Sequence, residues 1–337
     1  MALLSRRTLA AAGLAAVAAA SPLAAQGNPH LSIGGLAFAQ FAGQLGAGTN
    51  SNFDVTRAYL NFIGKFDGGF MTRVTTDLYQ NADGSHTYRL KYAFINWTPS
   101  GSALTYRFGL MTTPWIDWEE QMWDYRMQGP MAVDRNHFLT SSDFGAGVDG
   151  NIDNEAVDFQ ASVTDGPGYG AAPGDQHKAY AARASVRLIG TDEGSRVGGL
   201  RLTGYAQLGA PKGGGTRQRF MGMVSYRSKE VLLAGEYAAT TDSVTGQAVT
   251  GNVKGTVFSA YGFAHLPSSP VGLIARVDLV DPNTNVSGDK TTDIIGGISY
   301  QLSPNIRLLA DVDNLSFESS SSKKAITQAL FQTQFSF

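Results

Sequence analysis

The chain has 337 residues, of which 26 are basic, 28 acidic, 40 glycine, 12 proline and none cysteine. The slightly acidic balance argues against a nucleic-acid partner. The lack of cysteine excludes a disulfide framework and thiolate metal sites, and we expect neither a metal nor another cofactor. Beyond the N-terminus no segment reaches the ~18 uncharged apolar residues of a membrane helix, so only a closed barrel could satisfy the backbone in a membrane.

The N-terminus has the pattern of a secretory signal peptide. Arg6 and Arg7 precede an apolar run over 9–20, and small residues continue to Ala25. We predict a signal peptide over residues 1–25, cleaved after Ala25, which leaves 24 basic and 28 acidic residues. The pair of arginines also resembles a twin-arginine signal, but that route exports folded proteins, so the general secretion route is favoured.

Short segments that alternate apolar and polar residues follow the signal peptide. A period of two is typical of strands with one apolar face. We therefore predict an all-β fold over residues 26–337, a transmembrane antiparallel barrel of about sixteen strands in the outer membrane, in contact with its lipid. The predicted strands lie near residues 31–42, 53–65, 70–79, 87–97, 103–111, 143–150, 156–164, 178–189, 199–209, 217–227, 231–240, 255–265, 271–280, 292–301, 305–315 and 326–337.

The connections between these strands alternate in length. Those after even-numbered strands are short, and those after odd-numbered strands are mostly long, as at 44–52, 165–176 and 241–253. This alternation is typical of a barrel with periplasmic turns at one end and extracellular loops at the other. The connection 190–198 is an exception, since it is long for a turn. A soluble periplasmic β-sandwich is the alternative fold, because its strands alternate too.

The last strand carries a further signal. Phe331, Thr333, Phe335 and Phe337 share one face, and the chain ends on an aromatic residue. A terminal aromatic belongs in the interfacial girdle of a barrel in a bilayer. We predict that Phe335 and Phe337 form an assembly signal for the outer membrane.

Strand alternation also assigns side chains to the lumen. On the strand 87–97, Tyr88, Leu90, Tyr92 and Phe94 are predicted to face lipid. The basic residues predicted to line the pore on four consecutive strands are Arg57, Lys65, Arg73, Arg89, Lys91 and Arg107.

Further strands add inward charges of both signs. The basic ones are Arg183, Arg187, Arg201, Arg219, Arg227, Arg276 and Arg307, and the acidic ones are Asp77, Asp149, Asp158, Glu236, Asp278, Asp311 and Asp313. The basic excess predicts a lumen that concentrates anions. The alternative is that both signs simply solvate a water-filled barrel.

The longest connection, over residues 114–142, is predicted to be a constriction loop. It holds every tryptophan except Trp97, and Pro114 followed by a helical pattern predicts a short helix folded against the inner wall. Its acids would then oppose the basic wall across a narrowed pore. An extracellular cap or a contact with a neighbouring subunit is the alternative. The residues expected to act in this loop are Trp115, Asp117, Trp118, Glu119, Glu120, Trp123, Asp124 and Arg126.

Several stretches resemble a known family. They are T-R-A-Y-L-N-F-I-G-K-F-D-G-G-F over 56–70, Y-R-F-G-L-M over 106–111, T-P-W over 113–115 and the terminal F-S-F. These are similar to the phosphate-selective porin family of Gram-negative outer membranes. The resemblance implies a sixteen-stranded homotrimeric channel whose third extracellular loop folds inward. Because the stretch 112–130 of this loop has four acids and one arginine, Arg126, we predict a diffusion porin for small hydrophilic solutes with an anion preference, rather than a dedicated phosphate site.

Two other functions are open to this sequence. An outer-membrane hydrolase would need a nucleophile with a histidine base, but only five histidines occur and no G-x-S-x-G or H-E-x-x-H motif is found. We therefore expect no enzyme activity. A structural barrel that docks a partner protein is the other alternative, although an inserted loop would leave it little free bore.

Overall fold

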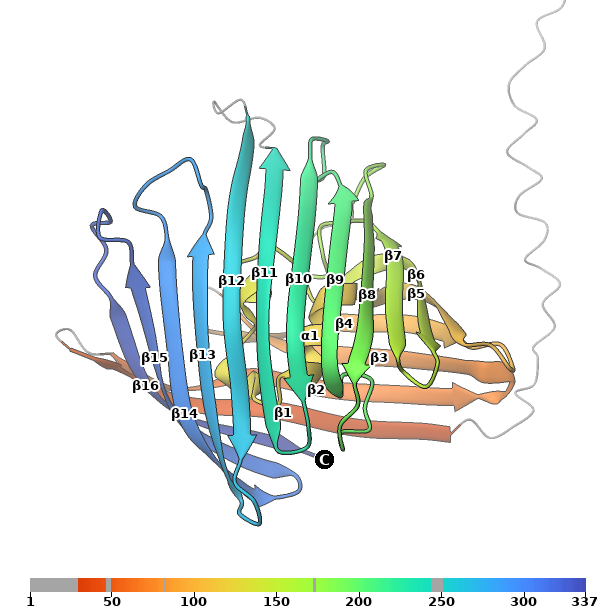
Figure 1. Cartoon of the computed structure of the whole chain (residues 1–337), viewed down its shortest axis with the longest axis horizontal. Helices are drawn as coiled ribbons and strands as arrows, with labels where there is room; N and C mark the ends of the chain where they lie inside the picture. Colours follow the sequence, from red (N-terminus) through yellow and green to blue (C-terminus); the bar gives the residue numbers. More distant parts are fainter. Residues whose placement is uncertain (1–29, 47–49, 82, 172–173, 244–250) are drawn as a thin grey trace, which may run out of the picture.

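The computed structural model describes residues 30–46, 50–81, 83–171, 174–243 and 251–337. The predicted signal peptide lies outside the described residues. Figure 1 shows long strands side by side, joined at both ends by connections. The described part of the chain therefore carries the whole sheet on which the predicted site depends.

Sixteen strands form one closed antiparallel barrel in which each strand pairs with its neighbours in sequence and β1 pairs with β16. The strands are β1 (His30–Leu45), β2 (Ser51–Phe66), β3 (Phe70–Gln80), β4 (His86–Trp97), β5 (Leu104–Thr112), β6 (Ser142–Ile152), β7 (Val157–Thr164), β8 (Ala179–Ile189), β9 (Gly199–Gly209), β10 (Arg217–Arg227), β11 (Val231–Ser243), β12 (Asn252–His265), β13 (Val271–Asp281), β14 (Thr291–Ser303), β15 (Ile306–Phe317) and β16 (Ile326–Ser336). The sixteen-stranded barrel predicted from the alternating pattern is confirmed.

The outer surface of the barrel is apolar. Large side chains such as Phe108, Tyr180 and Leu233 are exposed on it, as expected for a barrel whose outward face meets lipid. The terminal residue closes the barrel, because the Phe337 amide donates to the Gly35 carbonyl oxygen and the Gly35 amide donates to that of Phe337. The Phe337 ring lies directly over Gly35, where a Cβ atom would be 2.2 Å from the ring. A role of Phe335 and Phe337 in assembly stays a prediction.

Strand β4 departs from the predicted alternation. Thr75 of β3 pairs with Tyr92 while Thr76 pairs with Leu90, so Lys91 is the extra residue of a β-bulge. Lys91 and Tyr92 therefore both turn away from lipid, and Phe94 follows them. Tyr92 and Phe94 are 5% and 7% exposed, so the prediction that they face lipid is wrong. Tyr88 and Leu90, before the bulge, are exposed as predicted.

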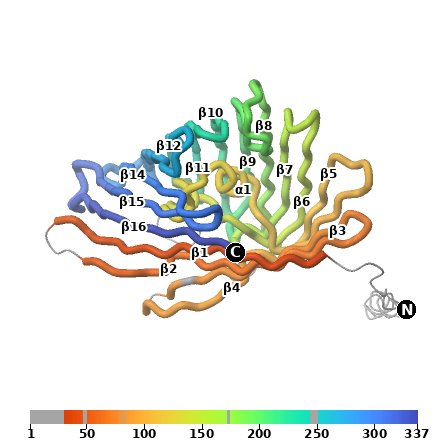
Figure 2. Tube along the Cα trace, turned by 90° about the horizontal axis from the view of Figure 1, so that it is seen from below, coloured from red at the N-terminus to blue at the C-terminus, as the bar shows by residue number. Residues whose placement is uncertain are grey.

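The segment between β5 and β6 contains α1 (Pro114–Met122), η2 (Arg126–Gln128) and α2 (Ala132–Arg135), and the turn between β2 and β3 contains η1 (Asp67–Gly69). Proline at the first helical position, with φ preset near its helical value, starts α1. In the trace of Figure 2, α1 lies between the β1 side and the β9 side of the barrel. None of the helices in the described ranges is long and apolar enough to span a bilayer.

Candidate functional site

Cations of β2, β4 and the β5–β6 segment gather around two carboxylates. Asp77 Oδ2 accepts from Arg57 Nη1 at 2.8 Å and from Arg89 Nη2 at 3.1 Å. Glu120 Oε1 accepts from Arg126 Nη2 at 2.6 Å and lies 3.8 Å from Lys91 Nζ. We call this group the basic cluster; its members are Arg57, Asp77, Arg89, Lys91, Glu120 and Arg126. Four cations share two carboxylates, so the cluster keeps a positive excess.

Two tyrosines complete the basic cluster. The Tyr59 hydroxyl accepts from Lys91 Nζ at 2.9 Å and from Arg126 Nη2 at 3.3 Å, both partners of Glu120. Its ring centroid lies 5.8 Å from the guanidinium carbon of Arg57, a partner of Asp77, so Tyr59 joins the two halves. Tyr169, from the β7–β8 connection, accepts from Arg89 Nη2 at 2.7 Å, and its ring centroid lies 4.4 Å from the guanidinium carbon. Sequence reasoning missed both. Tyr59 follows Arg57 by two residues on the same strand, so alternation could have placed both side chains on the inner face.

The other basic residues of the predicted wall lie outside this cluster. Arg107 Nη2 donates to Asp149 Oδ2 at 2.5 Å, which pairs it with an acid on β6. Arg73 Nη2 donates to the Asn61 side chain at 3.0 Å and its guanidinium lies 4.7 Å from the Tyr92 ring centroid. Lys65 is exposed near the end of β2. The structure thus joins only three of the six residues of the predicted wall in one cluster.

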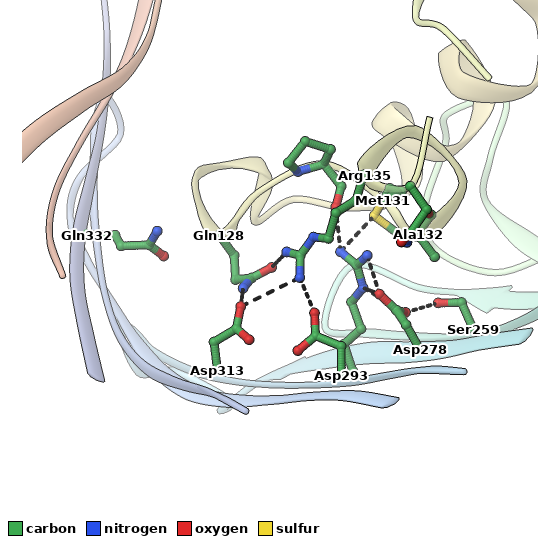
Figure 3. Close-up of polar contacts among 12 residues, drawn as sticks. Gln128, Met131, Ala132, Arg135, Ser259, Asp278, Asp293, Asp313 and Gln332 are labelled. Carbon is green, nitrogen blue, oxygen red and sulfur yellow. Dashed lines mark hydrogen bonds and ion pairs between the residues drawn. The ribbon is translucent and has the colours of Figure 1, made fainter. Parts of the chain in front are cut away.

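A second group of charges lies where the same segment meets β13 to β15 (Figure 3). Arg135 Nη1 bonds to Asp293 and lies 3.6 Å from Asp313 Oδ2. Arg276 Nη2 donates to Asp278 Oδ2 at 2.6 Å. We call this group the acidic cluster; its members are Arg135, Arg276, Asp278, Asp293, Asp311 and Asp313. Three of its carboxylates pair with the two cations, while both oxygens of Asp311 are buried without a hydrogen-bond donor among the described residues. Acids outnumber cations here, the reverse of the basic cluster.

The acidic cluster also fixes the backbone of the segment. Arg276 Nη1 donates to the Pro130 carbonyl oxygen at 2.9 Å, and Gln128 Nε2 donates to Asp313 Oδ2 at 3.2 Å. Farther round the barrel, Gln332 Nε2 donates to the Met127 carbonyl oxygen at 2.8 Å. Arg135 and Asp293 were missed from the sequence, although Asp293 lies at an inward position of its strand. Strand β13 to β16 side chains thus hold residues 127–135 in place.

The aromatic residues of α1 and the following turn are buried against strands. Trp115 packs on Tyr205 with ring centroids 5.7 Å apart, and Trp123 packs on Tyr261 at 5.6 Å. Trp118 lies under the guanidinium of Arg183, 4.2 Å from its ring centroid. All three tryptophans are at most 1% exposed. They therefore anchor the segment by apolar and cation–π packing.

The four acids predicted to act in this segment, Asp117, Glu119, Glu120 and Asp124, were expected to face one wall. In the structure they face different parts of the barrel. Asp117 bonds to Arg196, and Asp124 Oδ1 accepts from Arg227 Nη2 at 3.0 Å. Only Glu120 meets the basic cluster. Asp117 also lies in the field of Arg107 of the predicted wall, whereas Asp124 pairs with Arg227 of β10, so the expectation that all four acids oppose the basic wall is wrong. At 3.6 residues per turn, helical neighbours point in different directions.

Two of these acids have opposite electrostatic environments. Burial disfavours the charged form of Asp117, but the guanidinium groups of Arg196 and Arg107 outweigh it and lower the pKa of Asp117 below its ordinary value. Burial and the facing carboxyl group of Glu236 raise the pKa of Glu119 well above its ordinary value. Both oxygens of each glutamate are buried without a hydrogen-bond donor among the described residues. A proton shared between the two carboxyl groups would satisfy one oxygen of each.

Two cavities lie beside the segment. One has a volume of 470 Å³ and is lined by Arg57, Arg89 and Arg135 among others. The other has a volume of 280 Å³ and contains Glu120 and Arg126 in its lining. Arg57, Pro130, Asp134 and Arg135 line both cavities. These four residues therefore stand at the boundary between the two water-accessible spaces.

Two of the described histidines pair with aspartates. His177 Nδ1 lies 2.8 Å from Asp175 Oδ1, and His86 Nε2 lies 3.5 Å from Asp54 Oδ1. Among the described residues no serine forms a hydrogen bond with either ring, so neither pair has the third member of a hydrolase triad. In the same ranges no group of three or more acidic or histidine side chains could hold a metal ion.

No protein-family model and no curated protein matches the chain. Solved structures do match, and one is the anion-selective porin from Comamonas acidovorans, with 12% identity over 92% of this chain and 100% of that chain at a TM-score of 0.67. The fold is that of the porins. The trimer form of OmpT, an outer membrane protein of Vibrio cholerae, matches with 10% identity over 92% and 100% of the two chains at 0.67. The outer membrane channel DcaP of Acinetobacter baumannii matches with 10% identity over 93% and 98% at 0.65.

Proposed function

We propose that this protein is a porin of a Gram-negative outer membrane, a passive channel for small hydrophilic solutes with a preference for anions. The observation that carries this proposal is the boundary between the two cavities at Arg57, Pro130, Asp134 and Arg135. A solute that crosses there passes the basic cluster. A cationic wall in a narrow, low-dielectric passage concentrates anions.

The selectivity proposed is general and carries no dedicated phosphate site. The two carboxylates of the basic cluster bind its cations directly. Each arginine of the cluster is therefore paired with either Asp77 or Glu120. A net excess of charge attracts anions, while occupied guanidinium groups do not form a fixed bidentate site for one anion. The constriction role of residues 114–142 belongs to the same proposal.

The setting proposed is a homotrimer in outer-membrane lipid. The exposed apolar belt supports contact with lipid. One protein of the same fold is described as a trimer and another as anion-selective. An even number of strands puts both ends of the barrel chain on the side of the short turns, which is the periplasm in this orientation.

The experiment is a conductance and reversal-potential measurement on the purified protein in a planar bilayer under a KCl gradient. We expect ohmic steps and an anion preference that weakens as salt rises, because the Debye length falls from ~30 Å at 0.01 M to ~10 Å at 0.1 M. A folded, heat-modifiable oligomer that passes no current would contradict the channel and favour a docking role. A cation-selective current would contradict only the anion preference.

A further inference from the structure

The connection between β8 and β9, residues 190–198, is the longest of the described connections at its end of the barrel. It lies at the same end as the C-terminus, because both β8 and β16 are even-numbered strands that run toward that end. A barrel turn needs only a few residues to reverse the chain. The additional residues therefore call for a separate explanation.

The last residues of this connection pack into the barrel, while Asp192, Gly194 and Ser195 are exposed. Val197 is 2% exposed and belongs to the same apolar cluster as Trp115 and Trp118. The Thr191 hydroxyl donates to the Arg227 carbonyl oxygen at 2.5 Å, which ties the connection to β10. Gly198 packs so closely that a Cβ atom would lie 2.1 Å from the Glu193 carbonyl oxygen. The connection is thus a built structure with a defined inward face.

Arg196 is the residue of this connection that reaches α1. Its Nε donates to Gln121 Oε1 at 2.8 Å, and its Nη2 donates to Asp117 Oδ2 at 2.5 Å. Asp117 and Gln121 are four residues apart and share one face of α1. On the other side, Arg196 Nη1 lies 3.8 Å from Asp158 Oδ2 of β7. One guanidinium therefore connects the helix, the barrel wall and the periplasmic connection.

We propose that Arg196 is a positioning residue that holds α1 from the periplasmic side, so that the β8–β9 connection sets the width of the pore. The helix carries Glu120 toward Lys91 and Arg126 on another face. A shift or rotation of α1 would therefore change both the bore and the charge balance of the basic cluster. This inference rests on the proposed channel function.

The contact of Arg196 with Asp117 and Gln121 is suited to positioning α1. A charge-assisted, two-point contact from a planar guanidinium fixes orientation as well as distance. The Arg196 and Asp117 side chains are 21% and 19% exposed, so water reaches the contact and it can break without unfolding the core. The tryptophans hold the helix on the barrel, while Arg196 sets where on the wall its first turn rests.

The test compares Arg196→Gln, Asp117→Asn and the double variant by single-channel conductance and open-channel current noise. Arg187→Gln is the matched control, because Arg187 lies at the same end of the barrel and bonds to the Asn154 carbonyl oxygen away from α1. We expect both single variants to raise conductance and noise, the double variant to add little, and Arg187→Gln to behave as wild type. Arg196→Lys, which keeps the charge but not the two-point contact, should fall between wild type and Arg196→Gln.

Hydrogen exchange of the backbone amides of residues 117–122 compares the same variants without a current measurement. Loss of the contact should speed exchange there by about tenfold. The positioning role would be overturned if Arg196→Gln matched Arg187→Gln in conductance, noise and exchange rate. It would also be overturned if the fold-changes of Arg196→Gln and Asp117→Asn simply multiplied in the double variant. A wild type that conducts no ions while Arg196→Gln still speeds exchange would contradict the proposed function and leave the positioning role standing.

Discussion

The two charged clusters inside the barrel are near mirror images in charge. In the basic cluster four cations pair with Asp77 and Glu120, and in the acidic cluster three carboxylates pair with Arg135 and Arg276 while Asp311 lies nearby. The segment between β5 and β6 supplies a member to each, Glu120 and Arg126 on one side and Arg135 on the other. The strands of the two clusters, β2 to β4 and β13 to β15, are separated in the barrel by β1 and β16. Opposite excess charge on two stretches of the inner wall produces a field between them, and the segment reduces that field without cancelling it.

The difference between the clusters lies in their exposure. Of the cations of the basic cluster, Arg57, Arg89 and Arg126 are 22%, 28% and 22% exposed and only Lys91 is buried, at 1%. Of the paired carboxylates of the acidic cluster, Asp278 and Asp293 are 1% and 9% exposed and only Asp313 is more exposed, at 18%. Charges in contact with water act on passing ions, while buried and paired charges mainly fix structure. The basic cluster is therefore expected to determine selectivity, and the acidic cluster to seat the segment.

The largest change that tests the roles of the two clusters is removal of the segment that contacts both of them. Thr112 and Ser142 are paired across β5 and β6, so residues 113–141 can be replaced by Asn-Gly, a two-residue hairpin turn. We expect single-channel conductance to rise severalfold, because the narrowest cross-section controls the current. Heat-modifiable mobility on a gel serves as the folding control. Unchanged conductance in a folded variant would assign the constriction to another part of the barrel.

The second prediction tests the basic cluster alone. Arg57→Gln with Arg89→Gln removes two positive charges from the cluster and leaves the buried Asp77 carboxylate without its two arginine partners. We expect the anion to cation permeability ratio to fall by about tenfold at low salt, where screening is weak. Reversal potentials under a KCl gradient measure this ratio, with Arg187→Gln as a control for the loss of a distant cation. A ratio equal to that of the control would show that this cluster does not face the ion path.

Much of this architecture follows from the sequence, and one part of it does not. The alternation of apolar and polar residues predicted the strands and most inward residues, because successive side chains of a strand point to opposite faces of the sheet. The Lys91 bulge was not predictable, since one extra residue in β4 reverses the alternation without an obvious signal. Pairs such as Arg135 with Asp293 join positions 158 apart, and only the closed barrel brings them together. The distribution of the loop acids depended on helix rotation, which the sequence pattern leaves open.

The third prediction tests the acidic cluster. Asp293→Asn with Asp313→Asn leaves Arg135 without its carboxylate partners at the boundary of the two cavities. We expect a shift toward anions of about twofold, smaller than the previous effect because these carboxylates are less exposed and are already paired. The measurement is again the reversal potential, with conductance recorded to detect movement of the segment. A shift as large as that of the arginine variants would contradict the proposed division between selectivity and seating.

The smallest effect is expected from the buried contact of Glu119 with Glu236, which seats α1 opposite both clusters. Burial and Glu236 raise the pKa of Glu119, Asp134 raises it further, and Arg276 opposes them. A carboxyl group whose folded pKa is raised stabilises the docked helix fully at pH below its ordinary value near 4.5, and this stability is lost as pH rises through the folded pKa. Each unit of raised pKa corresponds to about 1.4 kcal/mol of docking free energy.

Glu119→Gln should therefore remove most of this pH dependence, because an amide cannot lose a proton and can donate to Glu236. The readout is open-channel noise across a pH series above 4.5: wild type should become noisier as pH rises and Glu119→Gln should change little. Glu230→Gln is the matched control, since it makes the same change from carboxyl to amide at an exposed position outside α1. Parallel pH profiles for wild type and Glu119→Gln would mean that the buried carboxyl pair does not govern the docking of α1, and that the tryptophan packing alone holds the helix between the two clusters.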